Sequence, residues 1–171
     1  MLKVVDWVQD NDKVIFLKIN RFGKYQITNF IMSVVTNLGG SVFSTAVSVL
    51  LLLSGDYRLY GLGQRLGPSL LVSHLIVRIG KGLFPRLRPY LMIENVYTGR
   101  KLYKDTSFPS GHSTAAFCMA AGFSSVLPVF SLTFFLLAGL VAISRVYLGM
   151  HYPSDIIAGA GIGILTALLM I

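Results

Sequence analysis

The chain has 171 residues, of which 54% are hydrophobic and only 13% are charged, and its mean hydropathy is +0.68. Soluble domains carry about 25% charged residues, so this composition excludes an ordinary soluble domain and predicts a protein embedded in a membrane. The formal net charge is +8, but the basic residues flank apolar runs or gather in one loop. That distribution favours lipid head groups or phosphates as partners and argues against nucleic acid.

Residues 1–24 mix apolar and charged side chains, a pattern typical of an amphipathic helix that lies in the membrane interface. We expect Trp7 and Phe16 to anchor this segment, and a frayed polar leader is the alternative. A cleavable signal peptide is not predicted, because the apolar core that it needs is interrupted by Asp6, Asp10 and Asp12.

The uncharged run 25–55 is too long for a single span of about 20 residues. Gly39-Gly40 divides it into a short helix at 26–38, which dips into the interface, and a first span at 41–55. A turn from Asp56 to Arg65 follows. Further spans are expected at 66–84, 111–127, 129–148 and 154–171.

These segments predict an all-α fold, because backbone groups in lipid must be paired within the chain. We expect an integral membrane bundle of about five to six transmembrane helices, forming a single domain over residues 1–171. Residues 1–24 would be its amphipathic interfacial segment and 26–171 its catalytic helical bundle. The lone Cys118 lies in an apolar stretch and is expected to be a small buried hydrophobic residue.

The spans also predict which polar segments meet. Two apolar passes of about 16 residues, each about 25 Å long, separate Ser110 from Ser144. The first pass crosses the membrane and the second returns. Residues 110–112 and 145–155 must therefore lie on the same side, and so must Lys81 and Arg88, which lead into the loop before Ser110.

The strongest candidate residues are Arg145, His151 and Asp155, placed within an apolar stretch. Ionisable groups beside hydrocarbon cost about 3 kcal/mol each, so such a cluster indicates function. A cation that holds an anion, an imidazole that attacks it and a carboxylate that orients the imidazole suit phosphoryl chemistry. The alternative is that His151 caps a helix and Asp155 is an ordinary charge at a helix N-terminus.

Pro109-Ser110-Gly111-His112 is predicted to open a helix. Ser110 suits the N-cap, and Gly111 lets an anion approach the unpaired N–H groups of the first turn. His112 would point at that anion. A simple loop-to-helix junction with an interfacial histidine is the alternative.

Lys81 and Arg88 supply further cations, so that Lys81, Arg88, Ser110, Gly111 and Arg145 form a cradle for a phosphoryl group without a metal. No metal-ligand spacing is evident. His74 is expected to have a hydrogen-bonded packing role. Head-group contact is expected of Arg78, Arg86, Arg100, Lys101 and Lys104.

Taken together, these residues resemble the signature of the type 2 phosphatidic acid phosphatase family, membrane lipid phosphatases with the motifs K-x6-R-P, P-S-G-H and S-R-x5-H-x3-D. Here the motifs read Lys81…Arg88-Pro89, Pro109-Ser110-Gly111-His112 and Ser144-Arg145…His151…Asp155, in the same order and spacing. The resemblance covers about residues 26–171.

The resemblance implies that His151 is the nucleophile that forms a phosphohistidine, with Asp155 as its partner and His112 as the general acid. Lys81, Arg88, Ser110, Gly111 and Arg145 would bind the phosphate. Such proteins work without a metal in the cell membrane. They hydrolyse phosphatidic acid, phosphatidylglycerophosphate or undecaprenyl diphosphate, among which the sequence does not choose.

Membrane orientation is predicted in two ways. Bacterial members of the family usually face outward, which places the site on the extracytoplasmic face, whereas the positive-inside rule places it in the cytoplasm. We expect the outward face, since several of the cations have a phosphate-binding use.

Alternatives to a hydrolase are a phosphotransferase with another acceptor and a non-enzymatic lipid-binding or transport protein. Vanadium haloperoxidases share the signature but are soluble, which this composition disfavours.

Overall fold

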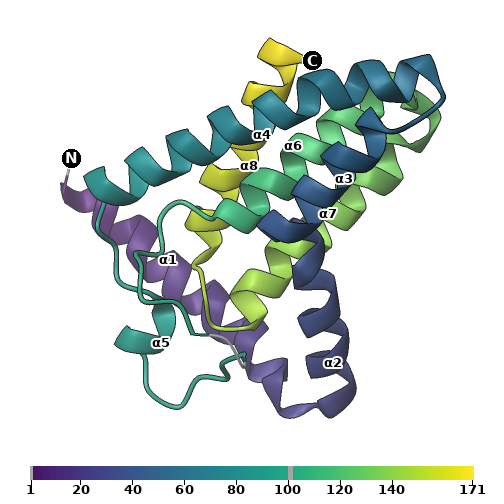
Figure 1. Cartoon of the computed structure of the whole chain (residues 1–171). Helices are drawn as coiled ribbons and strands as arrows, with labels where there is room; N and C mark the ends of the chain where they lie inside the picture. Colours follow the sequence, from purple (N-terminus) through teal and green to yellow (C-terminus); the bar gives the residue numbers. More distant parts are fainter. Residues whose placement is uncertain (1, 100–101) are drawn as a thin grey trace.

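The computed structural model describes residues 2–99 and 102–171. In chain order it contains α1 (Leu2–Asn20), a 3-10 turn (Arg21–Lys24), α2 (Gln26–Val35), a 3-10 turn (Thr36–Gly39), α3 (Ser41–Leu52), α4 (Tyr57–Leu83), α5 (Pro89–Met92), α6 (Gly111–Val126), a 3-10 turn (Pro128–Phe130), α7 (Ser131–Tyr147) and α8 (Pro153–Met170) (Figure 1). These two stretches contain no strand. The predicted all-α class is confirmed.

The long helix α4 begins earlier than predicted. A turn was expected from Asp56 to Arg65, but the helix starts at Tyr57. The reason is that the Asp56 carboxylate accepts hydrogen bonds from the backbone N–H groups of Arg58 at 2.8 Å and Leu59 at 3.1 Å. These bonds cap the first turn, so the turn prediction is wrong beyond Asp56.

Length and composition identify two to three candidate transmembrane helices in the part of the chain that the structure describes. In the described part of the chain, Pro128–Tyr147 and Pro153–Met170 are each long and apolar enough to cross a bilayer. The pair Gln26–Gly39 and Ser41–Leu52 passes the same test together, with a bend of 52° where the two glycines divide it. The helix α4 carries four basic residues and α6 has 16 residues. The count of five to six therefore stays a prediction.

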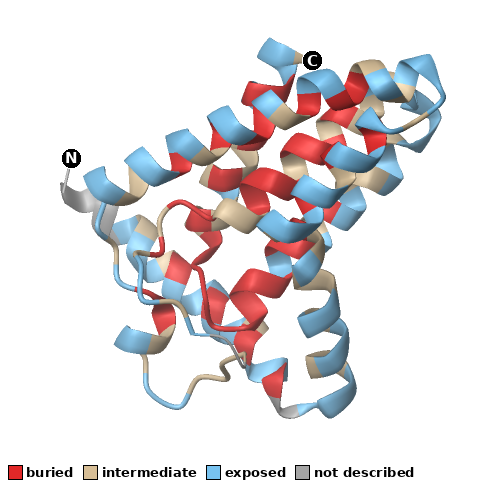
Figure 2. Ribbon diagram, viewed as in Figure 1, coloured by how far each residue is buried: buried red, intermediate tan, exposed pale blue. Residues whose placement is uncertain are grey.

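The helix α6 lies at the centre of the bundle, in contact with α4, α7 and α8, and half of its 16 residues are buried (Figure 2). It packs closely on α8, where a Cβ at Gly159 would lie 2.5 Å from the Ser110 carbonyl oxygen and one at Gly163 would clash with the Thr114 carbonyl oxygen. Glycines four residues apart are typical of closely packed membrane helices. This contact sets the first turn of α8 beside the first turn of α6.

The N-terminal helix α1 packs against α7 and α8. Trp7 is 66% exposed, as an interfacial anchor would be, but Phe16 is fully buried in a cluster with Val146 and Tyr152. The prediction of Phe16 as an anchor is therefore wrong, because its side chain faces the bundle. The polar side chain of Asp12 is buried on the same face of α1.

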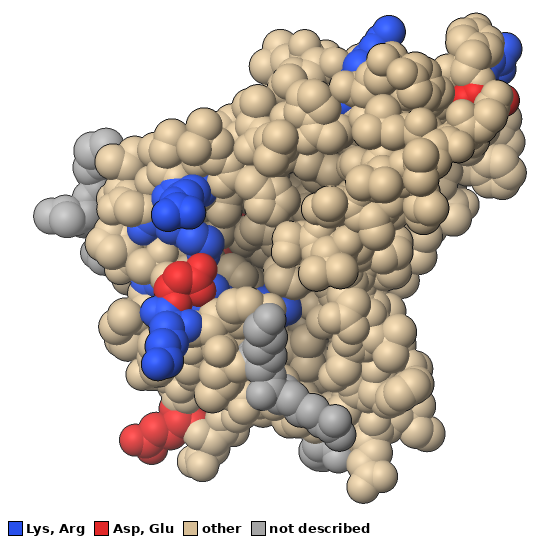
Figure 3. Space-filling model, in the orientation of Figure 1, with Lys and Arg blue, Asp and Glu red and all other residues tan. Residues whose placement is uncertain are grey.

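The molecular surface resembles that of a protein surrounded by lipid. On the face shown in Figure 3, charged side chains gather at the two ends of the molecule and an uncharged band lies between them. Large apolar side chains are exposed on the outside of the bundle, for example Leu71 and Leu75 on α4 and Leu165 and Leu168 on α8. An apolar belt between charged ends matches the hydrocarbon layer of a bilayer.

Candidate active site

The predicted site residues lie where four helix ends meet, the C-terminal ends of α4 and α7 and the N-terminal ends of α6 and α8. The backbone N–H of Ser110 donates to the Asp155 carbonyl oxygen at 3.1 Å, which joins α6 to α8. The N–H of Met150 donates to the Arg145 carbonyl oxygen at 3.0 Å and closes the turn from α7 into α8. Ser110 is fully buried and caps α6 through its hydroxyl. The three motifs, separated in sequence, thus lie together.

The imidazole of His151 is held between a carboxylate and a cation. It lies in the turn after α7, which Gly149 makes possible with a φ of +76°. Its Nδ1 faces the Asp155 carboxylate at 3.6 Å and has no hydrogen-bond partner among the described residues. Its Nε2 faces Nη1 of Arg88 at 3.3 Å. The ring is 2% exposed and Asp155 is fully buried.

Burial also decides the charge of this ring. It lowers the pKa of His151 from 6.5 to about 4, because the imidazolium would lose its hydration. The Asp155 carboxylate opposes this shift, and the positive charges of Arg145 and Arg88 add to it. The ring is therefore neutral at pH 7, with a nitrogen lone pair able to attack an electrophile.

Asp105, which no sequence pattern singled out, organises two of the predicted cations. Its carboxylate accepts from Nη2 of Arg88 at 2.7 Å and pairs with Nζ of Lys81 at 3.1 Å. Burial alone would raise the pKa of Asp105, but the hydrogen bonds and charges of Arg88 and Lys81 outweigh it and hold that pKa below 3.8. Arg88 is itself 2% exposed and donates to the Met150 carbonyl oxygen at 2.8 Å.

Arg145 and His112 line a cavity of about 690 Å³. Arg145 is buried and donates to the Thr36 hydroxyl at 2.9 Å, while its Nε has no hydrogen-bond partner among the described residues. The Tyr103 ring lies 5.4 Å from the Arg145 guanidinium carbon and meets the His112 ring edge-on at 6.3 Å. Buried donors without a partner are rare in folded proteins, so this Nε fits a site for an anion.

One wall of this cavity is formed by α2 and by the 3-10 turn that follows it, which sequence patterns did not connect with the site. Polar side chains recur there at helical spacing: Gln26, Asn29, Ser33 and Asn37. Phe30 and Val34 line the same wall and are 71% and 51% exposed. The cavity therefore runs from polar groups at His112 to an apolar outer surface.

Arg86 differs most from its predicted role. Head-group contact was expected, but its guanidinium forms ion pairs with Asp12 at 2.7 Å and Asp155 at 2.8 Å, so the prediction is wrong. Burial alone would lower the pKa of Arg86, but the charges and hydrogen bonds of these two carboxylates raise it.

The remaining residues with predicted roles have the following surroundings. Arg78 and Lys104 are exposed, as head-group contact requires, whereas Arg100 and Lys101 lie outside the described residues. His74 makes a 2.8 Å contact through Nδ1 with the Leu70 carbonyl oxygen of its own helix, and Cys118 is buried as predicted. Over residues 2–99 and 102–171, no three His, Cys, Asp or Glu side chains are grouped as metal ligands.

This chain is similar in sequence to known proteins. A family model described as the PAP2 superfamily matches residues 64–171. The lipid A 1-phosphatase of Rhizobium etli is 30% identical over 149 residues, covering 75% of this chain and 63% of that protein. The undecaprenyl-diphosphatase of Sulfolobus acidocaldarius is 28% identical over 146 residues, covering 83% of this chain and 68% of that protein.

Two crystal structures share the fold. A transmembrane PAP2-type phosphatidylglycerolphosphate phosphatase from Bacillus subtilis is 26% identical with a TM-score of 0.75, covering 95% of this chain and 84% of that one. LpxE of Aquifex aeolicus is 24% identical with a TM-score of 0.78, covering 91% and 92%. The helical membrane bundle is therefore shared. The chain spans 63% and 46% of the length of two lipid A 1-phosphatases, from Rhizobium etli and Rhizobium johnstonii. The helices α1, α2 and α3 precede the region of this chain that the family model matches.

Proposed function

This chain belongs to the PAP2 superfamily, and we propose that it is a membrane lipid phosphatase that hydrolyses a lipid phosphate or diphosphate through a phosphohistidine intermediate. One observation carries the proposal. The buried His151 imidazole lies with the Asp155 carboxylate on one side and the Arg88 guanidinium on the other. The relatives quoted above are named as a lipid A 1-phosphatase and an undecaprenyl-diphosphatase, which supports the same class of reaction.

The transferred phosphoryl group would be held by cations and backbone donors. Its transition state spreads negative charge over three equatorial oxygens. Lys81, Arg88 and Arg145 supply positive charge, and the Ser110 hydroxyl and the Gly111 N–H supply donors at the N-terminus of α6. The unpartnered Nε of Arg145 is a donor that a phosphate oxygen would satisfy.

In the first chemical step, Nε2 of His151 attacks phosphorus and the bond from phosphorus to the leaving oxygen breaks. His112, which would take up a proton when the phosphate anion binds beside it, donates that proton to the oxygen as it leaves. The phosphorylated ring carries a positive charge, which Asp155 stabilises by accepting a hydrogen bond from Nδ1–H. The present separation of 3.6 Å has to shorten to about 2.8 Å for that bond.

In the second step, water attacks the phosphohistidine. His112 accepts the proton from this water as its oxygen bonds to phosphorus, and the N–P bond breaks. Inorganic phosphate is then released and the neutral His151 ring is restored. No metal is required by this scheme, because fixed cations stabilise the developing charge.

The substrate would enter between α2 and the bundle. Its phosphate would lie at His112 and Arg145 and its polar head group along the side chains of α2, with the tail passing over Phe30 and Val34 into lipid. Undecaprenyl diphosphate, phosphatidylglycerophosphate and phosphatidic acid all have this arrangement of charge and tail, and we propose one of them as the type of substrate.

We further propose that the protein is a multi-pass protein of the cell membrane, with this site on the extracytoplasmic face. Lys81, Arg86, Arg88 and Arg145 are held in ion pairs or face the phosphate cavity. They are therefore not free loop charges of the kind that the positive-inside rule counts. A cysteine introduced at Thr98 should react with an impermeant thiol reagent added outside intact cells, and labelling only after lysis would reverse this orientation.

The decisive experiment is phosphate release from these three lipids in detergent, with wild-type protein and His151→Ala. We expect release from at least one lipid and a loss of at least 10³-fold in the variant, which removes the nucleophile. His74→Ala is the matched control, since that ring lies in α4 and bonds within its own helix. Turnover by His151→Ala at the wild-type rate would refute the assignment.

A further inference from the structure

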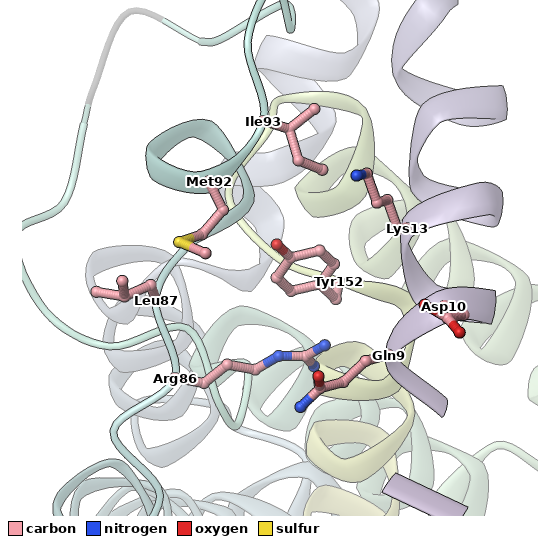
Figure 4. Close-up of a pocket in the computed structure, with 8 residues that line it drawn as sticks. All are labelled: Gln9, Asp10, Lys13, Arg86, Leu87, Met92, Ile93 and Tyr152. Atoms are coloured by element: carbon pink, nitrogen blue, oxygen red, sulfur yellow. The ribbon is translucent and has the colours of Figure 1, made fainter. Parts of the chain in front are cut away.

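A buried set of ion pairs links α1 to the carboxylate behind His151. Arg86, in the loop between α4 and α5, donates from Nη2 to Oδ2 of Asp12 at 2.7 Å and from Nη1 to Oδ1 of Asp155 at 2.8 Å. Asp12 is 3% exposed and Asp155 is fully buried. Figure 4 shows the Arg86 side chain extending below the Tyr152 ring toward Gln9 of α1. One guanidinium thus joins carboxylates from two helices.

Asp12 also caps the first turn of α8 from outside that helix. The backbone N–H of Ser154 donates to Oδ1 of Asp12 at 2.8 Å, and the Ser154 hydroxyl donates to Oδ2. The first N–H groups of a helix have no partner within it, and a negative charge there is favourable. Asp12 therefore holds both the guanidinium that binds Asp155 and the turn of helix that carries Asp155.

The two carboxylate oxygens of Asp155 have separate partners. Oδ1 accepts from Arg86, while Oδ2 accepts from the Tyr152 N–H at 2.8 Å and faces Nδ1 of His151. The Arg86 guanidinium also lies 4.0 Å from the centre of the Tyr152 ring. With Oδ1 held by Arg86, rotation of the carboxylate is restricted and Oδ2 stays directed at the imidazole.

We propose that Asp12 and Arg86 are positioning residues for the nucleophile, so that docking of α1 onto the bundle completes the alignment of Asp155 with His151. This inference rests on the proposed function, because it assigns an effect on the same reaction. Asp12 lies outside residues 64–171, the region that the family model matches. The alignment of a motif carboxylate would thus depend on a helix that contributes nothing to the motifs.

A purely structural ion pair would predict a different outcome, a less stable protein with unchanged turnover when folded. A positioning role predicts a lower kcat with an unchanged KM, since Asp12 and Arg86 do not line the cavity at His112. Misplacement of a reacting group by about 1 Å costs about 10²-fold in rate, and a carboxylate that loses one of two anchors should cost less, about tenfold.

The test compares Asp12→Asn with Asp10→Asn. Asp10 lies on the same helix, is exposed and has no ion pair among the described residues, so its substitution removes the same charge without touching Arg86. We expect kcat to fall about tenfold in Asp12→Asn and less than twofold in Asp10→Asn, with KM within twofold in both. Arg86→Lys should also lower kcat, because an ammonium lacks the planar fork that bridges two carboxylates.

Combining Asp12→Asn with Arg86→Lys should lower kcat by less than the product of the two single effects, because both substitutions weaken the same bridge to Asp155. Gel filtration and thermal unfolding in detergent identify the folded protein on which rates are compared. The inference is overturned if folded Asp12→Asn turns over like Asp10→Asn. Wild-type protein that releases no phosphate from the three lipids would refute the proposed function instead.

A measurement without substrate tests the positioning role of Asp12 independently of the proposed function. The chain has three histidines, so protein labelled with ¹⁵N-histidine gives few ring signals. We expect the His151 ring signals to shift in Asp12→Asn and to stay unchanged in Asp10→Asn. Identical His151 signals in the two variants would overturn the inference whether or not the lipids are substrates.

Discussion

A single methyl group added at Gly159 should separate α8 from α6 and thereby disturb the active site. A Cβ there would lie 2.5 Å from the Ser110 carbonyl oxygen, whereas carbon and oxygen atoms in close contact are about 3.3 Å apart. In Gly159→Ala the two helices must therefore move apart by about 0.8 Å. The hydrogen bond from the Ser110 N–H to the Asp155 carbonyl oxygen, now 3.1 Å, would lengthen to about 3.9 Å and be lost.

The expected effect on turnover follows from this displacement. Errors of about 1 Å in catalytic geometry cost about 10²-fold, so we expect kcat for phosphate release to fall about 10- to 100-fold in Gly159→Ala. The free energy of unfolding should change only modestly, because two effects of opposite sign act on it. Alanine gains about 1 kcal/mol of helix propensity over glycine, and overpacking removes about 1–3 kcal/mol.

Gly161→Ala is the matched control for this prediction. It makes the same substitution in the same helix, but no described atom of another helix lies within 4 Å of the added Cβ. Gly161→Ala should therefore keep wild-type turnover and unfold at a slightly higher temperature. If Gly159→Ala released phosphate within twofold of the rate of Gly161→Ala, the close contact between α6 and α8 would not control the site.

Three other predictions concern the charges of the site. Phosphoenzyme formation, trapped by rapid quenching, should be lost at low pH with a midpoint near 4, because protonation removes the lone pair of His151, whose pKa is lowered to about 4. A loss with a midpoint near 6.5 would contradict this. Asp105→Asn should raise KM about tenfold in steady-state assays, since Lys81 and Arg88 lose the carboxylate that orients them, while the exposed Glu94→Gln should match wild type. Vanadate at millimolar concentration should inhibit release and EDTA should leave it unchanged, and sensitivity to EDTA would refute the metal-free scheme.

The location of the candidate site was predictable because two simple rules act together. Apolar runs indicate which segments run the length of the bundle. Between residues 110 and 155 one such segment leads away and the next returns, so the two residues are expected at the same end. The hydrogen bond between these residues is the observed result. The start of α6 was also predictable, because Ser110 followed by Gly111 is a helix-start pattern and the helix does begin at Gly111.

The interactions that the sequence did not predict join residues that are far apart in the chain, where local sequence patterns carry no information. Asp12 is 74 residues from Arg86 and 142 from Ser154, so no spacing rule connects them. Among the α1 side chains from residue 7 onward, the buried face consists of Asp12, Phe16 and Asn20, four residues apart. This stripe mixes polar and apolar side chains, so hydrophobic periodicity alone assigns Phe16 to the wrong face. Such a face becomes visible only when the partner helices are known.

The distribution of ion pairs indicates where the fold leaves charge for a ligand. Among the described residues, Lys81 and Arg88 share Asp105, and Arg86 joins Asp12 to Asp155. Arg145 is buried and has no carboxylate within ion-pair distance in the same set. A buried cation without a counter-charge is unfavourable, and a bound phosphoryl group would remove that penalty. This is why Arg145, beside His112 at the cavity, is the residue around which we would centre the substrate phosphate.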